Sequence, residues 1–178
     1  MGKEKALLPF SNSKSFVNYL IDIYSQMNDS TLIVVLNREN EDKIKFEIGK
    51  RKKPILFLIN PEPEKGRFSS IKIGLDHIQK GRGAFIQNID NPFITKELIA
   101  EMQKRYQVNA FLVPQYNGKN GHPLLLGADL VRELKESKDS IHDLKSFLDS
   151  KEKQIVKTKG QGVLANINSP EDYQYWFS

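Results

Sequence analysis

An aspartate stands where a strand is predicted to end. Asp90 follows the apolar stretch Ala84–Ile89 and precedes an Asn-Pro pair and a predicted helix. In a parallel α/β sheet, ligands collect at the carboxyl ends of the strands. A carboxylate there can bind Mg²⁺, which takes one or two protein oxygens together with substrate phosphates. The position therefore makes Asp90 a candidate metal ligand, with the capping of a turn as the structural alternative.

A second candidate segment joins a predicted strand to a predicted helix and contains Gly66, Arg67, Ser69 and Ser70. Glycine allows the backbone to approach a ligand closely, and the free N–H groups of a helix start can bind phosphate. The two hydroxyls and the guanidinium could add contacts to a base or a phosphate. A serine-capped helix start is the simpler interpretation of this segment.

Two further segments contain polar residues near turns. His122 lies between Gly121 and Pro123 at the start of a predicted strand, without the HxH or HExxH spacing of a zinc site. Asn166 and Asn168 are two residues apart on an extended segment, so their side chains point the same way. The helix cap that follows explains the neighbouring Ser-Pro-Glu-Asp sequence but not the asparagine pair.

The elements that position these residues follow from apolar periodicity. Helices are predicted over residues 12–27 and 67–80, from Lys96, over 128–136, after the capping-box residues Ser140 and Asp143, and after Ser169. Strands are predicted at Thr31–Leu36, Ile44–Ile48, Ile55–Ile59, Ala84–Ile89, Ala110–Val113, Pro123–Leu126, Gln154–Thr158 and Val163–Asn166. The β-branched run Thr31–Leu36 and the apolar run Ile55–Ile59 are both typical of strands buried on both faces. Strands that alternate with helices predict one α/β domain with a mostly parallel sheet and helices on both faces.

Composition excludes several classes of protein. The chain has 178 residues, a net charge of +5, no cysteine and no apolar run long enough to span a membrane. The absence of cysteine excludes disulfides and is typical of a cytoplasmic protein. The basic run at residues 50–53 raises the alternative of nucleic-acid binding. We regard this alternative as the weaker one, because the other basic residues are scattered and no RNA-binding aromatic motif lies nearby.

The order of these motifs resembles the MobA-like family of Mg²⁺-dependent nucleotidyltransferases, which includes enzymes that join CMP or GMP to molybdopterin. The matching series is MGxxKALLPF, GRFSSIKIGL, NIDNPFI, VPxxxGKNGHPLLL and NINSPEDY, and it runs from Met1 to Tyr173. The resemblance implies a Rossmann-like, three-layer α/β/α fold of the nucleotide-diphospho-sugar transferase type. It also implies transfer of NMP from CTP or GTP to a phosphorylated acceptor such as molybdopterin, with release of pyrophosphate.

The resemblance also implies roles for individual residues, and these extend the candidates above. Gly2 and Lys5 match the end of the signature loop, where the lysine binds the triphosphate. Gly66, Ser69 and Ser70 match the segment that lines the base and ribose, and Asp90 matches the aspartate that binds the catalytic Mg²⁺. Gly121, His122 and Pro123 match a segment that borders the acceptor. Asn166 and Asn168 match the second metal-side segment. Arg67 would add positive charge at the phosphates.

Two of the chain's departures from the family pattern bear most directly on activity. Asn166 and Asn168 replace the Asp-Ile-Asp of the cytidylyltransferase branch, and amides bind Mg²⁺ more weakly than carboxylates, so a site with one carboxylate is expected. Met1 matches the end of the family's LAAGxSxRMG loop, so the strand before that loop, normally central in the sheet, is missing. We therefore expect either a polypeptide that begins further upstream or a rearranged homologue that binds a nucleotide or cofactor without turnover. The 178-residue chain alone is predicted to have little activity.

Overall fold

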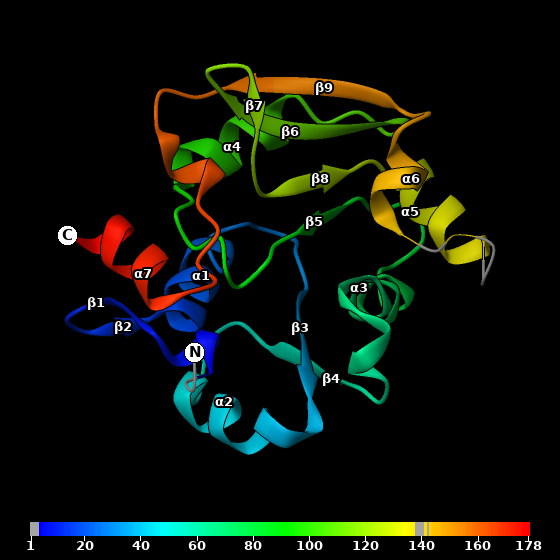
Figure 1. The fold of residues 1–178 in the computed structure, drawn as a ribbon. Helices are drawn as coiled ribbons and strands as arrows, with labels where there is room; N and C mark the ends of the chain where they lie inside the picture. The colour runs from blue at the N-terminus through cyan, green and yellow to red at the C-terminus, as the bar shows by residue number, and fades with distance from the viewer. Residues whose placement is uncertain (1–3, 138–140, 142) are drawn as a thin grey trace.

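The computed structural model describes residues 4–137, 141 and 143–178, and its elements alternate between strands and helices (Figure 1). The helices are α1 (Phe16–Tyr24), α2 (Glu41–Ile48), α3 (Arg67–Asp76), α4 (Lys96–Lys104), α5 (Ala128–Glu136), α6 (Leu144–Leu148) and α7 (Pro170–Phe177). The strands are β1 (Pro9–Ser11), β2 (Lys14–Ser15), β3 (Leu32–Asn37), β4 (Ile55–Asn60), β5 (Ala84–Ile86), β6 (Ala110–Tyr116), β7 (Lys119–Asn120), β8 (Leu124–Leu126) and β9 (Glu152–Lys157). Short 3₁₀ turns, including Lys5–Leu7 and Gln161–Leu164, join some of them. No helix in these ranges is both long and apolar enough to cross a membrane.

The strands form three separate sheets rather than one. β1 and β2 make a small hairpin, β3 and β4 make a parallel pair, and β5, β8, β6 and β7 follow one another in a larger sheet in which β9 also pairs with β6. Leu32–Asn37 of β3 stands in register with Ile55–Asn60 of β4. β3 and β5 share no ladder, and this gap is the main departure from a continuous α/β sheet.

The large sheet is mixed, so the prediction of a mostly parallel sheet is wrong. β6 and β9 are parallel, whereas β8 runs antiparallel to both of its neighbours, β5 and β6. Parallel neighbours need a crossover of a dozen or more residues. Only the short β7 turn separates β6 from β8, so the chain must return in the opposite direction.

The helices pack in two groups around the strands. Side chains of α3, α5 and α6 form a core cluster with β5, β6 and β8, and it includes Leu75, Leu130 and Phe147. Other clusters hold α1 against α2, β3 and β4, and α4 against β6, β8 and β9. Figure 1 shows α3, α5 and α6 on one side of the strands, with α1 and α4 on the other. The predicted α/β architecture with helices on both faces is therefore present.

Two predicted strands are a helix and a turn. Ile44–Ile48 lies within α2, where Ile44 and Ile48 are buried four residues apart and Phe46 is 89% exposed. The alternation of apolar and polar residues in IKFEI is typical of a strand. The buried residues, however, are four apart, which is the spacing of one face of a helix. Val163–Asn166 was also predicted as a strand, but it overlaps the 3₁₀ turn Gln161–Leu164 and forms no ladder.

The other element predictions agree with the structure to within a few residues at their ends. The prediction for α7 is confirmed in detail, because Ser169 and Asp172 form a reciprocal capping box and Pro170 is the first helical residue. The helix predicted after Ser140 begins at Leu144 and is capped by Asp143. Ser140 itself lies outside the described residues.

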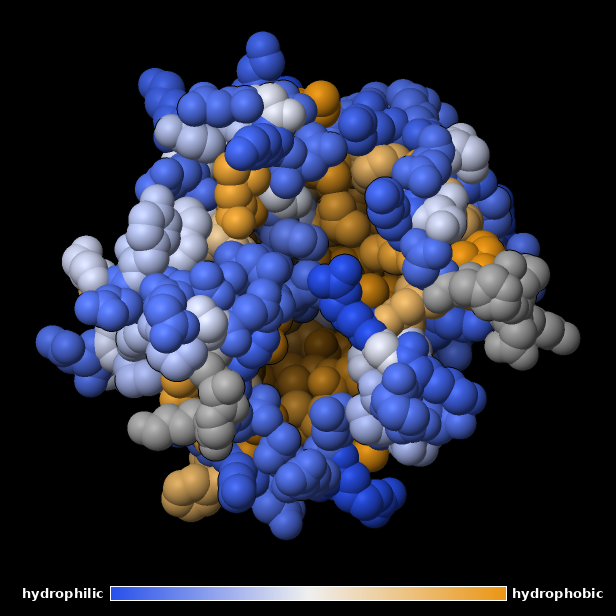
Figure 2. Space-filling view, in the orientation of Figure 1, coloured by the Kyte–Doolittle hydropathy of each residue, from blue (hydrophilic) through white to orange (hydrophobic). Residues whose placement is uncertain are grey.

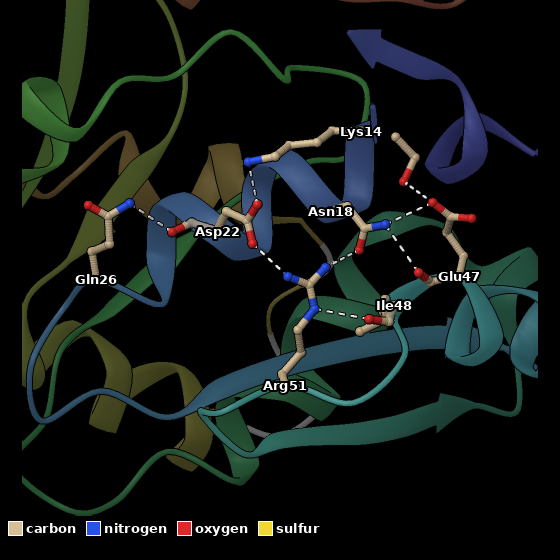
Figure 3. A network of polar contacts seen from close by, with 8 residues as sticks. Lys14, Asn18, Asp22, Gln26, Glu47, Ile48 and Arg51 are labelled. Carbon is tan, nitrogen blue, oxygen red and sulfur yellow. Dashed lines mark hydrogen bonds and ion pairs between the residues drawn. The ribbon is translucent and has the colours of Figure 1, made fainter. Parts of the chain in front are cut away.

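Arg51, in the basic run at residues 50–53, belongs to a polar network that joins α1 to the end of α2 (Figure 3). Arg51 pairs with Asp22 at 2.6 Å and donates to the Ile48 carbonyl at 2.9 Å. Lys53 donates to the Met27 carbonyl. Half of the run therefore has intramolecular partners, which weakens the nucleic-acid alternative further.

Candidate functional site

Two loops that are far apart in the sequence, at residues 90–91 and 165–167, contact each other. The N–H of Ile167 donates to the main-chain carbonyl of Asp90 at 2.8 Å. The amide of Asn91, which is 3% exposed, donates to the carbonyl of Ala165. These bonds place the asparagine-containing segment 166–168 directly beside Asp90.

Two cavities meet at Arg67 and Asp90, which line both of them. The larger one, of about 840 Å³, is also lined by Lys5, Ser70 and apolar residues of β3 and β5. The smaller one, of about 250 Å³, is lined by Gly121, His122, Asn166 and their neighbours. Candidate residues from five distant segments of the sequence therefore line two cavities that share Arg67 and Asp90.

Two side-chain atoms at this junction are buried without a hydrogen-bond partner among the described residues, Oδ1 of Asp90 and Nδ1 of His122. Buried polar atoms nearly always have partners, and exceptions often mark places where a ligand or an ion binds. Burial lowers the pKa of His122, the nearby charge of Arg67 lowers it further, and Asp90 opposes both. A lowered pKa keeps the imidazole neutral at neutral pH, so that it can both donate and accept a hydrogen bond.

Close backbone packing holds the segment that carries His122. The N–H of Gly121 donates to the Pro114 carbonyl at 2.8 Å, and that of His122 donates to the Val163 carbonyl at 2.9 Å. A Cβ atom at Gly121 would lie 2.3 Å from the carbonyl oxygen of Val163. Only glycine fits here without a shift of the backbone. The next peptide bond, between His122 and Pro123, is cis.

A buried asparagine at the end of β4 holds the serine pair. Asn60 is 2% exposed, and its amide donates to the hydroxyls of Ser69 at 2.8 Å and Ser70 at 2.9 Å. Its Oδ1 accepts from the N–H of Glu62 at 2.9 Å. Gly66, which precedes α3, has a φ of 84°, a conformation that glycine adopts at no steric cost. The first turn of α3 is thereby fixed against the end of β4.

The two ends of the described chain meet at Lys5. Its Nζ donates to Oδ1 of Asn168 at 2.5 Å. The carboxylate of Asp172 accepts from the N–H groups of Asn168 and Ser169, both at 2.9 Å. Hydrogen bonds from these two backbone groups lower the pKa of Asp172, and the charge of Lys5 adds to the effect. Lys5 thus reaches the edge of the larger cavity from a fixed position.

The structure gathers most of the predicted site residues, but not all of them. Lys5, Arg67, Ser70 and Asp90 line the larger cavity, and Gly121, His122 and Asn166 line the smaller one together with Arg67 and Asp90. Four other predicted site residues line neither cavity: Gly66, Ser69, Pro123 and Asn168. Gly2 lies outside the described residues. The role that the resemblance implies for each of these residues stays a prediction.

Sequence reasoning missed Asn60 and undervalued Asn91. Both are buried polar residues near the end of an apolar segment, where ligands collect: Asn60 is the last residue of β4, and Asn91 follows Asp90. The same criterion that selected Asp90 would have selected Asn60, which ends the run ILFLIN.

The donor set fits a magnesium-type ion better than a zinc ion. Nowhere in the described ranges do three or more His, Cys, Asp or Glu side chains group in a way that could hold a metal by themselves. Mg²⁺ needs only one or two carboxylates, since substrate phosphates and water supply the other oxygens. The unpartnered Asp90 oxygen, with Asn166 lining the same cavity, satisfies that requirement.

Comparison with known proteins agrees with this arrangement. Residues 1–156 match the model of the MobA-like NTP transferase domain. No individual curated protein matches the chain.

Solved structures share the fold at low sequence identity. Rv0371c from Mycobacterium tuberculosis, determined in complex with manganese, has a TM-score of 0.73 and 16% identity, over 98% of this chain and 91% of that one. Molybdopterin-guanine dinucleotide biosynthesis protein A from Archaeoglobus fulgidus has a TM-score of 0.66 and 17% identity, over 98% and 89%. A 2-C-methyl-D-erythritol 4-phosphate cytidylyltransferase from Thermus thermophilus has a TM-score of 0.66 and 13% identity, over 96% and 91%.

Proposed function

Because this chain belongs to the family of MobA-like NTP transferase domains, we propose that it transfers NMP from CTP or GTP to a phosphorylated acceptor, of which molybdopterin is one candidate. A phosphate oxygen of the acceptor attacks the α-phosphorus of the NTP. The bond from that phosphorus to the bridging oxygen breaks, and pyrophosphate leaves. The observation that supports this proposal most strongly is the buried, unpartnered oxygen of Asp90 where the two cavities meet.

The two cavities, which share Arg67 and Asp90, suggest separate places for the two substrates. The nucleotide would occupy the side of Lys5, Arg67 and Ser70, where two cations and a hydroxyl face its phosphates. The acceptor would approach from the side of Gly121, His122 and Asn166. The reacting groups would then meet beside Arg67 and Asp90. Phosphoryl chemistry of this kind depends chiefly on positioning and on charge stabilisation.

A divalent cation, Mg²⁺ or Mn²⁺, would bind to Asp90 with Asn166 nearby, and when bound it would neutralise charge on the phosphates. Lys5 and Arg67 would hold the triphosphate in place from two sides. The neutral His122 would bind the acceptor through a hydrogen bond rather than by charge, because burial lowers its pKa.

The test is metal-dependent nucleotide binding by calorimetry, followed by pyrophosphate release with candidate acceptors. We expect CTP or GTP to bind only with Mg²⁺ or Mn²⁺, and Asp90→Asn to weaken that binding about tenfold or more, which corresponds to ~1.4 kcal/mol. Asp76→Asn is the matched control, because Asp76 is exposed on α3 and lines neither cavity. Absence of binding, or equal binding by the two variants, would refute the proposal.

A second candidate function is nucleotide or cofactor binding without turnover. The large apolar opening between β3 and β5, directly beside the phosphate-facing residues, favours it. Pyrophosphate release by the 178-residue chain that Asp90→Ala abolishes would exclude this alternative.

A further inference from the structure

An aromatic cluster joins the three segments that contain or follow candidate site residues. Phe10 lies five residues after Lys5, and Phe93 lies three residues after Asp90. α7 begins just after the asparagine-containing segment 166–168. The aromatic cluster consists of Phe10, Phe16, Phe93, Tyr173, Trp176 and Phe177. Packing among these rings therefore holds the three segments together.

Phe177, in the last turn of α7, contacts rings from all three segments. Its ring centroid lies 5.7 Å from those of Phe10 and Phe16, and 5.0 Å from that of Phe93. Tyr173, one turn earlier on the same helix, stacks on it at 4.6 Å. Aromatic pairs attract each other at centroid distances of ~4.5–7 Å, so all four contacts are favourable. Phe177 therefore packs α7 against both of the other segments at once.

Hydrogen bonds at the start of α7 continue this connection to the site. Asp172 accepts from the N–H of Asn168, and the side chain of Asn168 accepts from Lys5. The N–H of Ile167 donates to the main-chain carbonyl of Asp90. If α7 moved, Lys5 would lose the partner that fixes its ammonium group, and the loop at Asp90 would lose its neighbour.

No member of the aromatic cluster lines either cavity, although the structure describes all six of them. Figure 2 shows the larger cavity as a hollow with hydrophobic residues at its floor, and Figure 1, in the same orientation, places α7 to the left of it. Trp176 and Phe177 also lie beyond residues 1–156, which match the family model, and beyond the motif NINSPEDY. The aromatic cluster can therefore act on a ligand only through the segments that it joins.

We propose that Phe177 is a positioning residue, which keeps α7 docked so that Lys5 and Asp90 face the same phosphate groups. This role rests on the proposed function, in which Lys5 binds the triphosphate and Asp90 binds the metal ion. A displacement of about 1 Å at reacting groups can lower a rate about 100-fold. Loss of the Phe177 ring should therefore lower kcat by about tenfold or more. The KM for the nucleotide should change by less than about threefold, because Arg67 and Ser70 lie on α3, which contributes no side chain to the aromatic cluster.

The first test needs no nucleotide and compares Phe177→Ala with Tyr175→Ala, which removes a ring of the same helix that is 68% exposed. In Phe177→Ala we expect the Ile167 amide to exchange about tenfold faster by NMR, because the local contact opens more often. Acetylation of Lys5 by acetic anhydride, followed by mass spectrometry, should accelerate to a similar extent. Both rates should stay unchanged in Tyr175→Ala, and the amides of β6 should keep their rates in both variants. Phe177→Leu, which keeps an apolar side chain, should restore most of the protection.

The second test measures kcat and KM for pyrophosphate release in the same variants. A fall in kcat with the KM retained, together with faster exchange and acetylation, would support the proposal. Unchanged Ile167 exchange and Lys5 acetylation in Phe177→Ala would overturn it, as would faster exchange with an unchanged kcat. Absence of nucleotide binding and turnover in the wild type would refute the proposed function alone. The exchange and acetylation rates would then still decide whether Phe177 positions Lys5 and Asp90.

Discussion

Replacing Asn60 with alanine should destabilise the protein and the serine pair together. Asn60 makes three hydrogen bonds of 2.8 to 2.9 Å, to the hydroxyls of Ser69 and Ser70 and the N–H of Glu62. It is almost fully buried, so water cannot readily replace the lost partners. Each such bond contributes about 1 kcal/mol net. The expected loss is therefore roughly 3 kcal/mol in the free energy of unfolding.

This loss is measurable by urea and by thermal unfolding. For a domain of this size, 1 kcal/mol shifts the midpoint temperature by about 2–4 °C, so Asn60→Ala should lower it by roughly 6–12 °C. Asn109→Ala is the control, because Asn109 is exposed and makes one bond of 3.3 Å to Glu152. We expect that change to stay within about 0.5 kcal/mol.

A double-mutant cycle separates the hydrogen bond from the loss of packing. In a Ser70→Ala background, Asn60→Ala should cost less than in the wild type, because one of its partners is already gone. Nucleotide affinity should also fall in Asn60→Ala, since the serines lose the group that positions them. Full additivity of the two changes, or a stability within 0.5 kcal/mol of the wild type for Asn60→Ala, would refute the positioning role of Asn60.

Two further predictions concern the acceptor side of the site. Gly121→Ala should lower the free energy of unfolding by about 1–3 kcal/mol, because its Cβ would lie 2.3 Å from a carbonyl oxygen. Gly160→Ala is the control and should lower it little, because the nearest contact of its Cβ is 3.9 Å away. Equal unfolding midpoints for the two variants would contradict this. Because the pKa of His122 is lowered in the folded protein, the unfolded chain binds more protons below about pH 6.5. Stability from this group is therefore complete above that pH and lost as the pH falls below it. His122→Gln should flatten that part of a plot of unfolding free energy against pH, and an unchanged slope would show that another group is responsible.

The positions of most helices and strands could be predicted because their signals are local. The alternation of apolar runs with amphipathic stretches predicted most elements, and the capping residues predicted α7 in detail. Local patterns predicted the wrong element where the two-residue period of a strand and the 3.6-residue period of a helix fit the same segment. Ile44–Ile48 alternates like a strand, but the contacts of Ile44 and Ile48 with α1 and β3 decide that it is a helix.

The sequence alone selected Asp90, Arg67, Ser70 and His122, because polar residues after apolar strands stand at the edge where ligands bind. It did not show which of these residues meet. That depends on contacts between distant segments, such as the bonds from Ile167 to Asp90 and from Lys5 to Asn168. It also depends on the buried Asn60, whose partners become visible only when β4 and α3 are packed together.

The direction of the strands and the open edge were decided by the tertiary structure. The short connection from β6 to β8 forces an antiparallel return, so the sheet is mixed. The folded chain leaves β3 and β5 apart, with a cavity between them, because no described segment pairs with both of their open edges. Hydrogen bonding between strands is a long-range property, and composition and periodicity do not specify it.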